Sequence, residues 1–145
     1  MNPKILFGID YIEIMLESEK RQSRGIDNKI INFSKFLLAW DWGFIPSELK
    51  EVHSYFIEKN RLGASENFLD VVKRMVNHLK NNIEAKSTFV RNMILISYLD
   101  EFITDEEEKL IIGLAIELGF QQTEIDEMNS DSMNRFLAIK YYLSI

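Results

Sequence analysis

Ten consecutive residues, Leu99 to Glu108, read LDEFITDEEE, and six of them are acidic. Carboxylates at this density have two ordinary uses. They bind hard cations such as Ca²⁺ and Mg²⁺, which take several carboxylate and carbonyl oxygens from a short stretch of chain. They also stabilise the first turn of a helix, where the positive end of the helix dipole favours negative charge. The two uses predict different partners for the same side chains.

Helix construction explains the second half of the stretch. Thr104 and Glu107 have the spacing of a capping box, in which an N-cap hydroxyl and a glutamate three residues later each accept a backbone N–H. Asp100 is different, because it ends the apolar row of the preceding helix and opposes the dipole there, at a cost of about 0.3–1 kcal/mol. It either closes its own loop through an Asx-type turn or contributes to a cation site.

An earlier turn repeats this pattern. The segment AWDWGFIPSELKEV aligns with YLDEFITDEEEKL once an extra residue is allowed in the first turn. We therefore expect two helix hairpins related by approximate symmetry. The acidic stretch lacks the ligand alternation and glycine of an EF-hand loop, so a Ca²⁺ or Mg²⁺ site would need oxygens from both hairpins. The four candidate ligands are Asp41, Glu48, Asp100 and Glu106.

No nucleophile or zinc motif accompanies these acids. The chain has no cysteine, and its two histidines lack the HExxH spacing of zinc proteases. His53 lies on the apolar line of its helix, where we expect it half-buried with a hydrogen-bond partner, and His78 is expected at the surface. The serines lack a GxSxG elbow and the glycines form no phosphate loop. We therefore expect no catalytic activity.

Composition excludes several classes of partner. The net charge of −6 argues against nucleic acid and against an anionic membrane surface. No apolar run approaches the roughly 18 residues of a membrane span, and the N-terminus lacks the pattern of a signal peptide. Apolar residues make up 46% of the 145 residues, which is enough for a core. We expect a single cytoplasmic domain over residues 1–145.

Apolar residues recur at helical spacing along nearly the whole chain, and both prolines stand at helix starts or turns. The pattern predicts an all-α compact bundle of seven or eight helices. The fifth helix carries apolar residues on several faces and is expected to be the buried centre. The expected helices cover residues 3–21, 27–41, 47–60, a fourth from an N-cap at Ser65 to about 79, 87–99, 104 to a C′ glycine at Gly119, a short one from Thr123, and 131–143.

The turn from Asp100 to Glu107 resembles the recurring turn of the TerB-like family, the tellurite-resistance-associated helical domains. In that family an Asp-Gly pair, an Ile or Val, and a Ser or Thr cap followed by acids join two helices. The similarity is best over residues 91–128 and departs at Glu101, where the family usually has glycine. It implies a seven-helix bundle with paired acidic turns and a stress or tellurite-resistance context. Metal binding has been proposed for the family, and no catalysis is established.

Two functions stay open. The first is a non-catalytic acidic domain that binds a divalent cation through its paired turns. The second is a metal-independent protein–protein interaction module. Trp40 is expected in the core and Trp42 exposed at the turn, where exposed tryptophans often act as binding hot spots. The apolar C-terminus could form a partner surface or a homodimer interface. The three candidate partner-binding residues are Trp42, Tyr141 and Tyr142.

Overall fold

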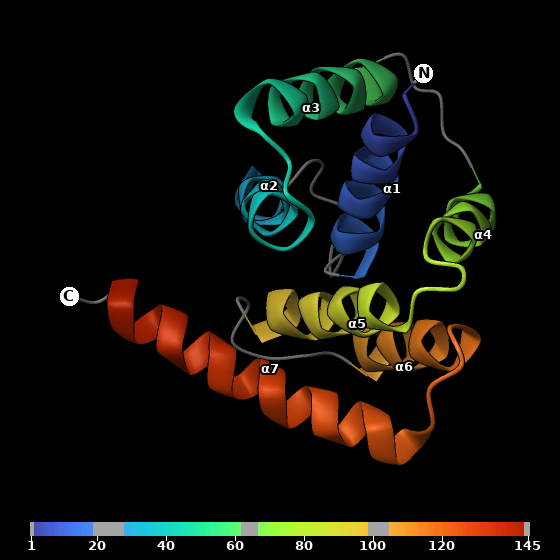
Figure 1. Cartoon of the computed structure of the whole chain (residues 1–145), viewed down its shortest axis with the longest axis vertical. Helices are drawn as coiled ribbons and strands as arrows, with labels where there is room; N and C mark the ends of the chain where they lie inside the picture. Colours follow the sequence, from blue (N-terminus) through green and yellow to red (C-terminus); the bar gives the residue numbers. More distant parts are fainter. Residues whose placement is uncertain (1, 19–27, 62–66, 99–104, 144–145) are drawn as a thin grey trace. The chain divides into compact units, whose positions relative to one another are not determined.

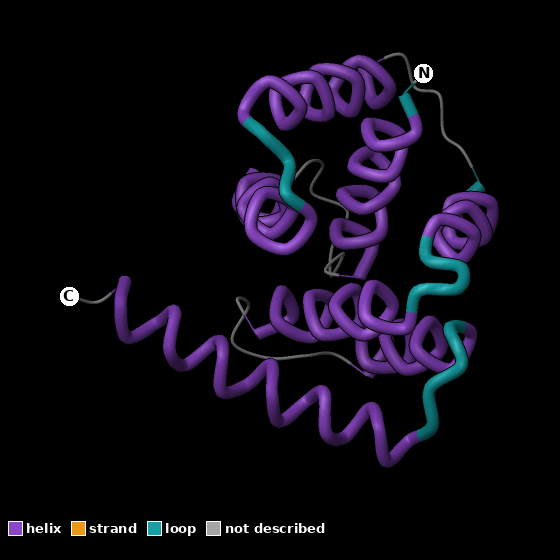
Figure 2. Tube along the Cα trace, viewed as in Figure 1, coloured by secondary structure: helices purple, strands orange, loops and turns teal. Residues whose placement is uncertain are grey.

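The computed structural model describes residues 2–18, 28–61, 67–98 and 105–143. In these ranges the chain forms seven α-helices and no strand (Figures 1 and 2). This confirms the prediction of an all-α helical bundle. The helices are α1 (Pro3–Ser18), α2 (Asn28–Trp42), α3 (Pro46–Arg61), α4 (Phe68–His78), α5 (Ile83–Tyr98), α6 (Asp105–Glu117) and α7 (Gln122–Leu143). None of these described helices has the length and apolar character needed to cross a bilayer.

The helices pack as two compact units, one of α1–α4 and one of α5–α7. The prediction that they make a single domain stays a prediction. In the first unit, α2, α3 and α4 surround α1 (Figure 1). Helix α1 is buried on nearly every side, as is typical of a central helix. Its buried apolar residues are Ile5, Phe7, Ile9, Tyr11, Ile12, Ile14 and Met15.

In the second unit the central helix is α5, as predicted. Phe89, Val90 and residues 92–97 are all buried, and α7 packs along α5. The predicted break between a seventh and an eighth helix is wrong, because α7 is continuous. The Ser132 hydroxyl donates to the Arg91 carbonyl oxygen at 3.0 Å, and Arg91 pairs with Asp131 at 3.0 Å. These contacts with α5 keep the polar segment between the expected helices helical.

Two helix starts differ from the predicted ones because asparagine supplies the cap. Asn67 caps α4, where its side-chain oxygen accepts the Leu69 N–H at 3.0 Å, while the predicted cap Ser65 lies outside the described residues. Asn82 caps α5 in the same way through the Ala85 N–H. The fifth helix therefore begins one turn before its predicted start. Asparagine is as effective at this position as serine.

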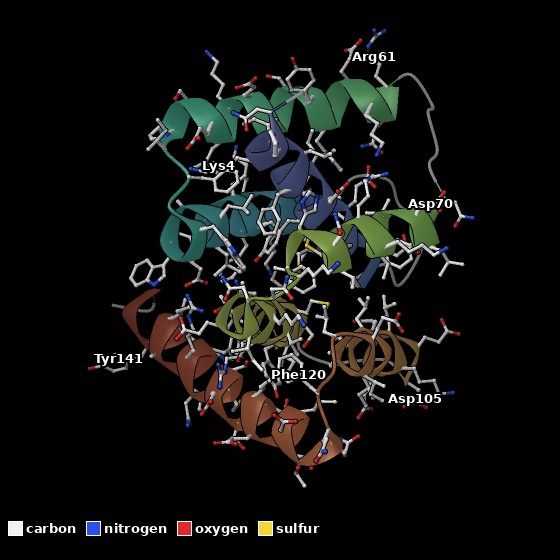
Figure 3. All side chains as sticks on the ribbon, turned by 45° about the vertical axis from the view of Figure 1, so that its right-hand side comes forward. Lys4, Arg61, Asp70, Asp105, Phe120 and Tyr141 are labelled. Carbon is white, nitrogen blue, oxygen red and sulfur yellow. The ribbon has the colours of Figure 1, made fainter. Side chains whose placement is uncertain are left out.

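The predicted C′ glycine at the end of α6 is confirmed. Gly119 has a φ of +99°, a conformation that glycine adopts without strain. The Gly119 N–H donates to the Ile116 carbonyl oxygen and the Phe120 N–H to that of Ala115, which together make a Schellman motif. Phe120, marked in Figure 3, is buried directly after the turn.

Gly8 allows α1 to approach α3 closely. A Cβ atom at this position would lie 2.7 Å from Val52 Cγ2 and 3.1 Å from Phe44 Cε2. Overpacking of this kind costs about 1–3 kcal/mol, which exceeds the roughly 1 kcal/mol that alanine gains over glycine inside a helix. We expect Gly8→Ala to lower the free energy of unfolding, measured by urea denaturation. Gly113 on α6 has open space around it, so Gly113→Ala is the matched control and should stabilise. Equal effects at both positions would contradict this packing.

Candidate functional site

Glu48, a candidate cation ligand, is occupied within the first unit. Its Oε1 accepts the backbone N–H of Ile45 and the ammonium of Lys4, both at 2.9 Å. Figure 3 marks Lys4 beside the turn that leads into α3. The Ile45 N–H, and after it Lys4, hold the pKa of Glu48 below its usual value. Glu48 therefore caps α3 and pairs with α1, since a glutamate at the third helical position reaches back to the N-cap N–H.

The other candidate ligands form no described metal site. Asp41 is half-buried in the last turn of α2, Glu106 is exposed in the first turn of α6, and Asp100 lies outside the described residues. Among the residues that the structure describes, no three His, Asp or Glu side chains converge as metal ligands would. A divalent-cation site through Asp100 stays a prediction.

The two tryptophans of α2 do not lie as predicted. Trp40 was expected in the core but is 70% exposed. Trp42 was expected to be exposed but is half-buried, with its ring centroid 5.5 Å from that of Phe7 and 5.2 Å from that of Tyr11. The buried stripe of α2 runs through Ile30, Ser34 and Leu37, so Trp40 lies outside it. Trp42, on α2, therefore packs against α1.

At the C-terminus, Tyr141 extends from α7 into solvent and is 65% exposed (Figure 3). It is accessible, as a partner-binding residue must be. Tyr142 belongs to the last turn of α7, and its side chain lies outside the described part of the structure.

A buried carboxylate that the sequence analysis did not single out joins α1 to α4. Asp10 is fully buried. Arg74 Nε donates to its Oδ2 at 3.1 Å and Arg74 Nη2 to its Oδ1 at 2.8 Å. His78 Nε2 lies 3.2 Å from Oδ2. Both partners come from α4. A bidentate guanidinium and an imidazole therefore fix α4 against α1 through one carboxylate.

The partners of Asp10 keep it ionised. Burial by itself raises the pKa of Asp10, but the hydrogen bonds from His78 and Arg74, together with the charge of Arg74, outweigh it and hold the pKa below its usual value. His78 was predicted at the surface, and this is wrong. Its side chain is mostly buried, and its ring packs edge-on against Phe7, with centroids 5.6 Å apart. Asp10 is one of three acids, with Glu13 and Glu17, that interrupt the apolar sequence of α1, and no local signal distinguishes it from the other two.

The outer face of α2 carries an aromatic row, defined here as Phe33, Phe36 and Trp40. The ring centroids of Phe33 and Phe36 lie 5.8 Å apart and those of Phe36 and Trp40 lie 5.5 Å apart. Phe36 is 45% exposed and Trp40 more so. The three rings therefore form a continuous apolar row over two turns, in which Phe33 is half-buried and Phe36 and Trp40 face solvent.

His53 is half-buried with a hydrogen-bond partner, as predicted. Its Nδ1 lies 2.9 Å from the Lys35 ammonium of α2. Burial, and then the charge of Lys35, lower the pKa of His53. The ring is therefore neutral at pH 7, and its Nδ1 accepts a hydrogen bond from the Lys35 ammonium. A shallow hollow beside it is lined by Lys35, Pro46, Leu49, Lys50, His53 and Ser54.

No protein-family model, curated protein or solved structure matches this chain. The TerB-like resemblance rests on the sequence of residues 91–128 and stays a prediction. Function must be argued from the sites themselves.

Proposed function

We propose that this chain is a non-catalytic interaction module that binds a protein partner through the aromatic row of α2. The exposure of Phe36 and Trp40, side by side on one helix face, is the observation that carries the proposal. Exposed contiguous apolar patches mark interaction sites, and tryptophan is enriched among the residues that dominate binding energy. A cytoplasmic location, which the cysteine-free sequence supports, belongs to the same proposal.

The spacing of the row indicates the kind of partner. Phe33, Phe36 and Trp40 stand at positions i, i+3 and i+7, the anchors of a helix that lays one face into an apolar groove. The partner is therefore a protein with an apolar groove. No metal is needed for this binding.

Site-specific crosslinking tests the proposal. A photoreactive residue placed at Phe36 should capture a partner in cells, whereas one at Tyr55, an equally exposed aromatic on α3, should not. With the purified partner, Trp40→Ala and Phe36→Ala should each raise the dissociation constant by about 30-fold, since hot spots contribute about 2 kcal/mol or more. Tyr55→Ala should leave it unchanged.

Three outcomes would count against the proposal. The first is equal capture from Phe36 and Tyr55. The second is an unchanged affinity in Trp40→Ala, provided that its circular dichroism is native. The third is a crosslink to a second copy of the chain alone, which would make the row a homodimer interface instead.

A further inference from the structure

A shallow, open hollow between α2 and α3 brings two lysines, a serine and His53 beside a small apolar surface. Its volume is about 350 Å³, at the lower end of the range for ligand pockets. Lys35 comes from α2, and the other five lining residues recur along α3 at spacings of three and four, so they share one face of that helix. Pro46 and Leu49 give it an apolar side near the start of α3.

The polar groups of the hollow offer donors and positive charge. Lys35 donates to His53 Nδ1, so the proton of the neutral ring is on Nε2, which is a second donor. Lys50 adds a second ammonium and Ser54 a hydroxyl. The charged groups beside His53 are Lys35 of α2 and Lys50 of α3, and no acid is among the described residues that line the hollow.

We propose that this hollow binds the phosphate group of a small phosphate monoester. Two ammonium groups match the charge of a phosphate dianion, and charge-assisted hydrogen bonds to phosphate are short and strong. Pro46 and Leu49 would contact an apolar part of the same molecule. Because the chain as a whole carries a charge of −6, general attraction does not favour anions, and binding must come from these local donors. The site uses none of the residues of the aromatic row, so it stands apart from the proposed function.

The two histidines of the chain make the test internally controlled. Phenyl phosphate is titrated at constant ionic strength while the ring proton signals of His53 and His78 are followed by NMR. We expect the His53 signal to move saturably and its pKa to rise, because a bound anion favours the imidazolium. His78 lies in the Asp10 cluster and should not move. Benzoate, with a single charge, should bind at least about tenfold more weakly.

Variants separate this site from nonspecific charge effects. Lys50→Met should weaken phenyl phosphate binding by about tenfold or more, since it removes one charge-assisted contact. Lys35→Met should do the same, and without ligand it should raise the pKa of His53, because Lys35 lowers it. Lys109→Met, at an exposed lysine of α6, should change nothing. A shift that never saturates, equal movement of both histidines, or full binding by Lys50→Met would overturn the proposal. Benzoate binding as tight as that of phenyl phosphate would overturn its assignment to phosphate.

Discussion

Arg74→Ala is expected to lower the free energy of unfolding by about 3–5 kcal/mol at pH 7, measured by urea denaturation. The substitution removes both guanidinium hydrogen bonds from Asp10, which is fully buried and, among the described residues, keeps its contact with His78. A buried charge left without its partner strongly destabilises the fold, whereas the intact pair contributes less than this to the free energy of unfolding. The Arg74 side chain is 32% exposed, so we expect a value near the lower end of this range.

Two controls separate this effect from the loss of any arginine. Arg61→Ala removes a guanidinium from an exposed pair with Glu58 on α3, and such pairs have little effect on stability. The double variant Asp10→Leu with Arg74→Leu removes both charges and should be more stable than Arg74→Ala alone. If Arg74→Ala and Arg61→Ala were equally mild, the carboxylate would not be the buried centre of the cluster.

The cluster also predicts how stability depends on pH. The pKa of Asp10 is lowered in the folded chain from its usual value of 3.8. As the pH falls, Asp10 is therefore protonated in the unfolded chain before it is protonated in the folded chain. The stabilisation is complete above the unfolded pKa and is lost as the pH falls through the lower folded pKa. The stability advantage of the wild type over Asp10→Asn should therefore be constant near neutral pH and shrink at strongly acidic pH. A stability advantage over Asp10→Asn that stayed constant down to strongly acidic pH would contradict the lowered pKa of Asp10.

Phe7→Ala is expected to lower the free energy of unfolding by about 3–5 kcal/mol, the usual cost of removing a buried phenylalanine ring. The Phe7 ring lies 5.5 Å from Trp42 and 5.6 Å from His78, and it also contacts Tyr11 and Phe44. These residues come from three helices and the turn before α3. Truncation would therefore leave a cavity at the point where α1, α2 and α4 meet.

Tryptophan fluorescence gives this prediction a second readout. In a Trp40→Phe background, Trp42 is the only tryptophan, and its emission should shift to the red when Phe7 is removed because its ring gains contact with water. Phe36→Ala, which truncates an exposed ring, is the matched control and should affect stability far less. A Phe7→Ala variant as stable as Phe36→Ala would contradict the packing of Trp42 on α1.

Local sequence signals predicted several features that depend on neighbours along the chain. Helical spacing and the lack of strand patterns predicted the all-α fold, and Gly119 marked the end of α6 because only a left-handed residue closes that turn without strain. The apolar residues on several faces of α5 predicted its central place. The capping role of Glu48 was equally local, since it needs only the Ile45 N–H three residues earlier. The capping box was nevertheless predicted only at the later turn, from Thr104 to Glu107.

The tertiary structure decided everything that depends on which neighbours surround a helix. Adjacent faces of α2 are both apolar in places, and tertiary packing buries the one that contains Ser34 and leaves Trp40 in solvent. Asp10 has the sequence context of an ordinary helical acid, and only the arrival of α4, more than fifty positions later, supplies its charge partners. Periodicity along one helix cannot report contacts made across that distance. The sequence by itself therefore determined the elements, and their packing determined which side chains are free to bind.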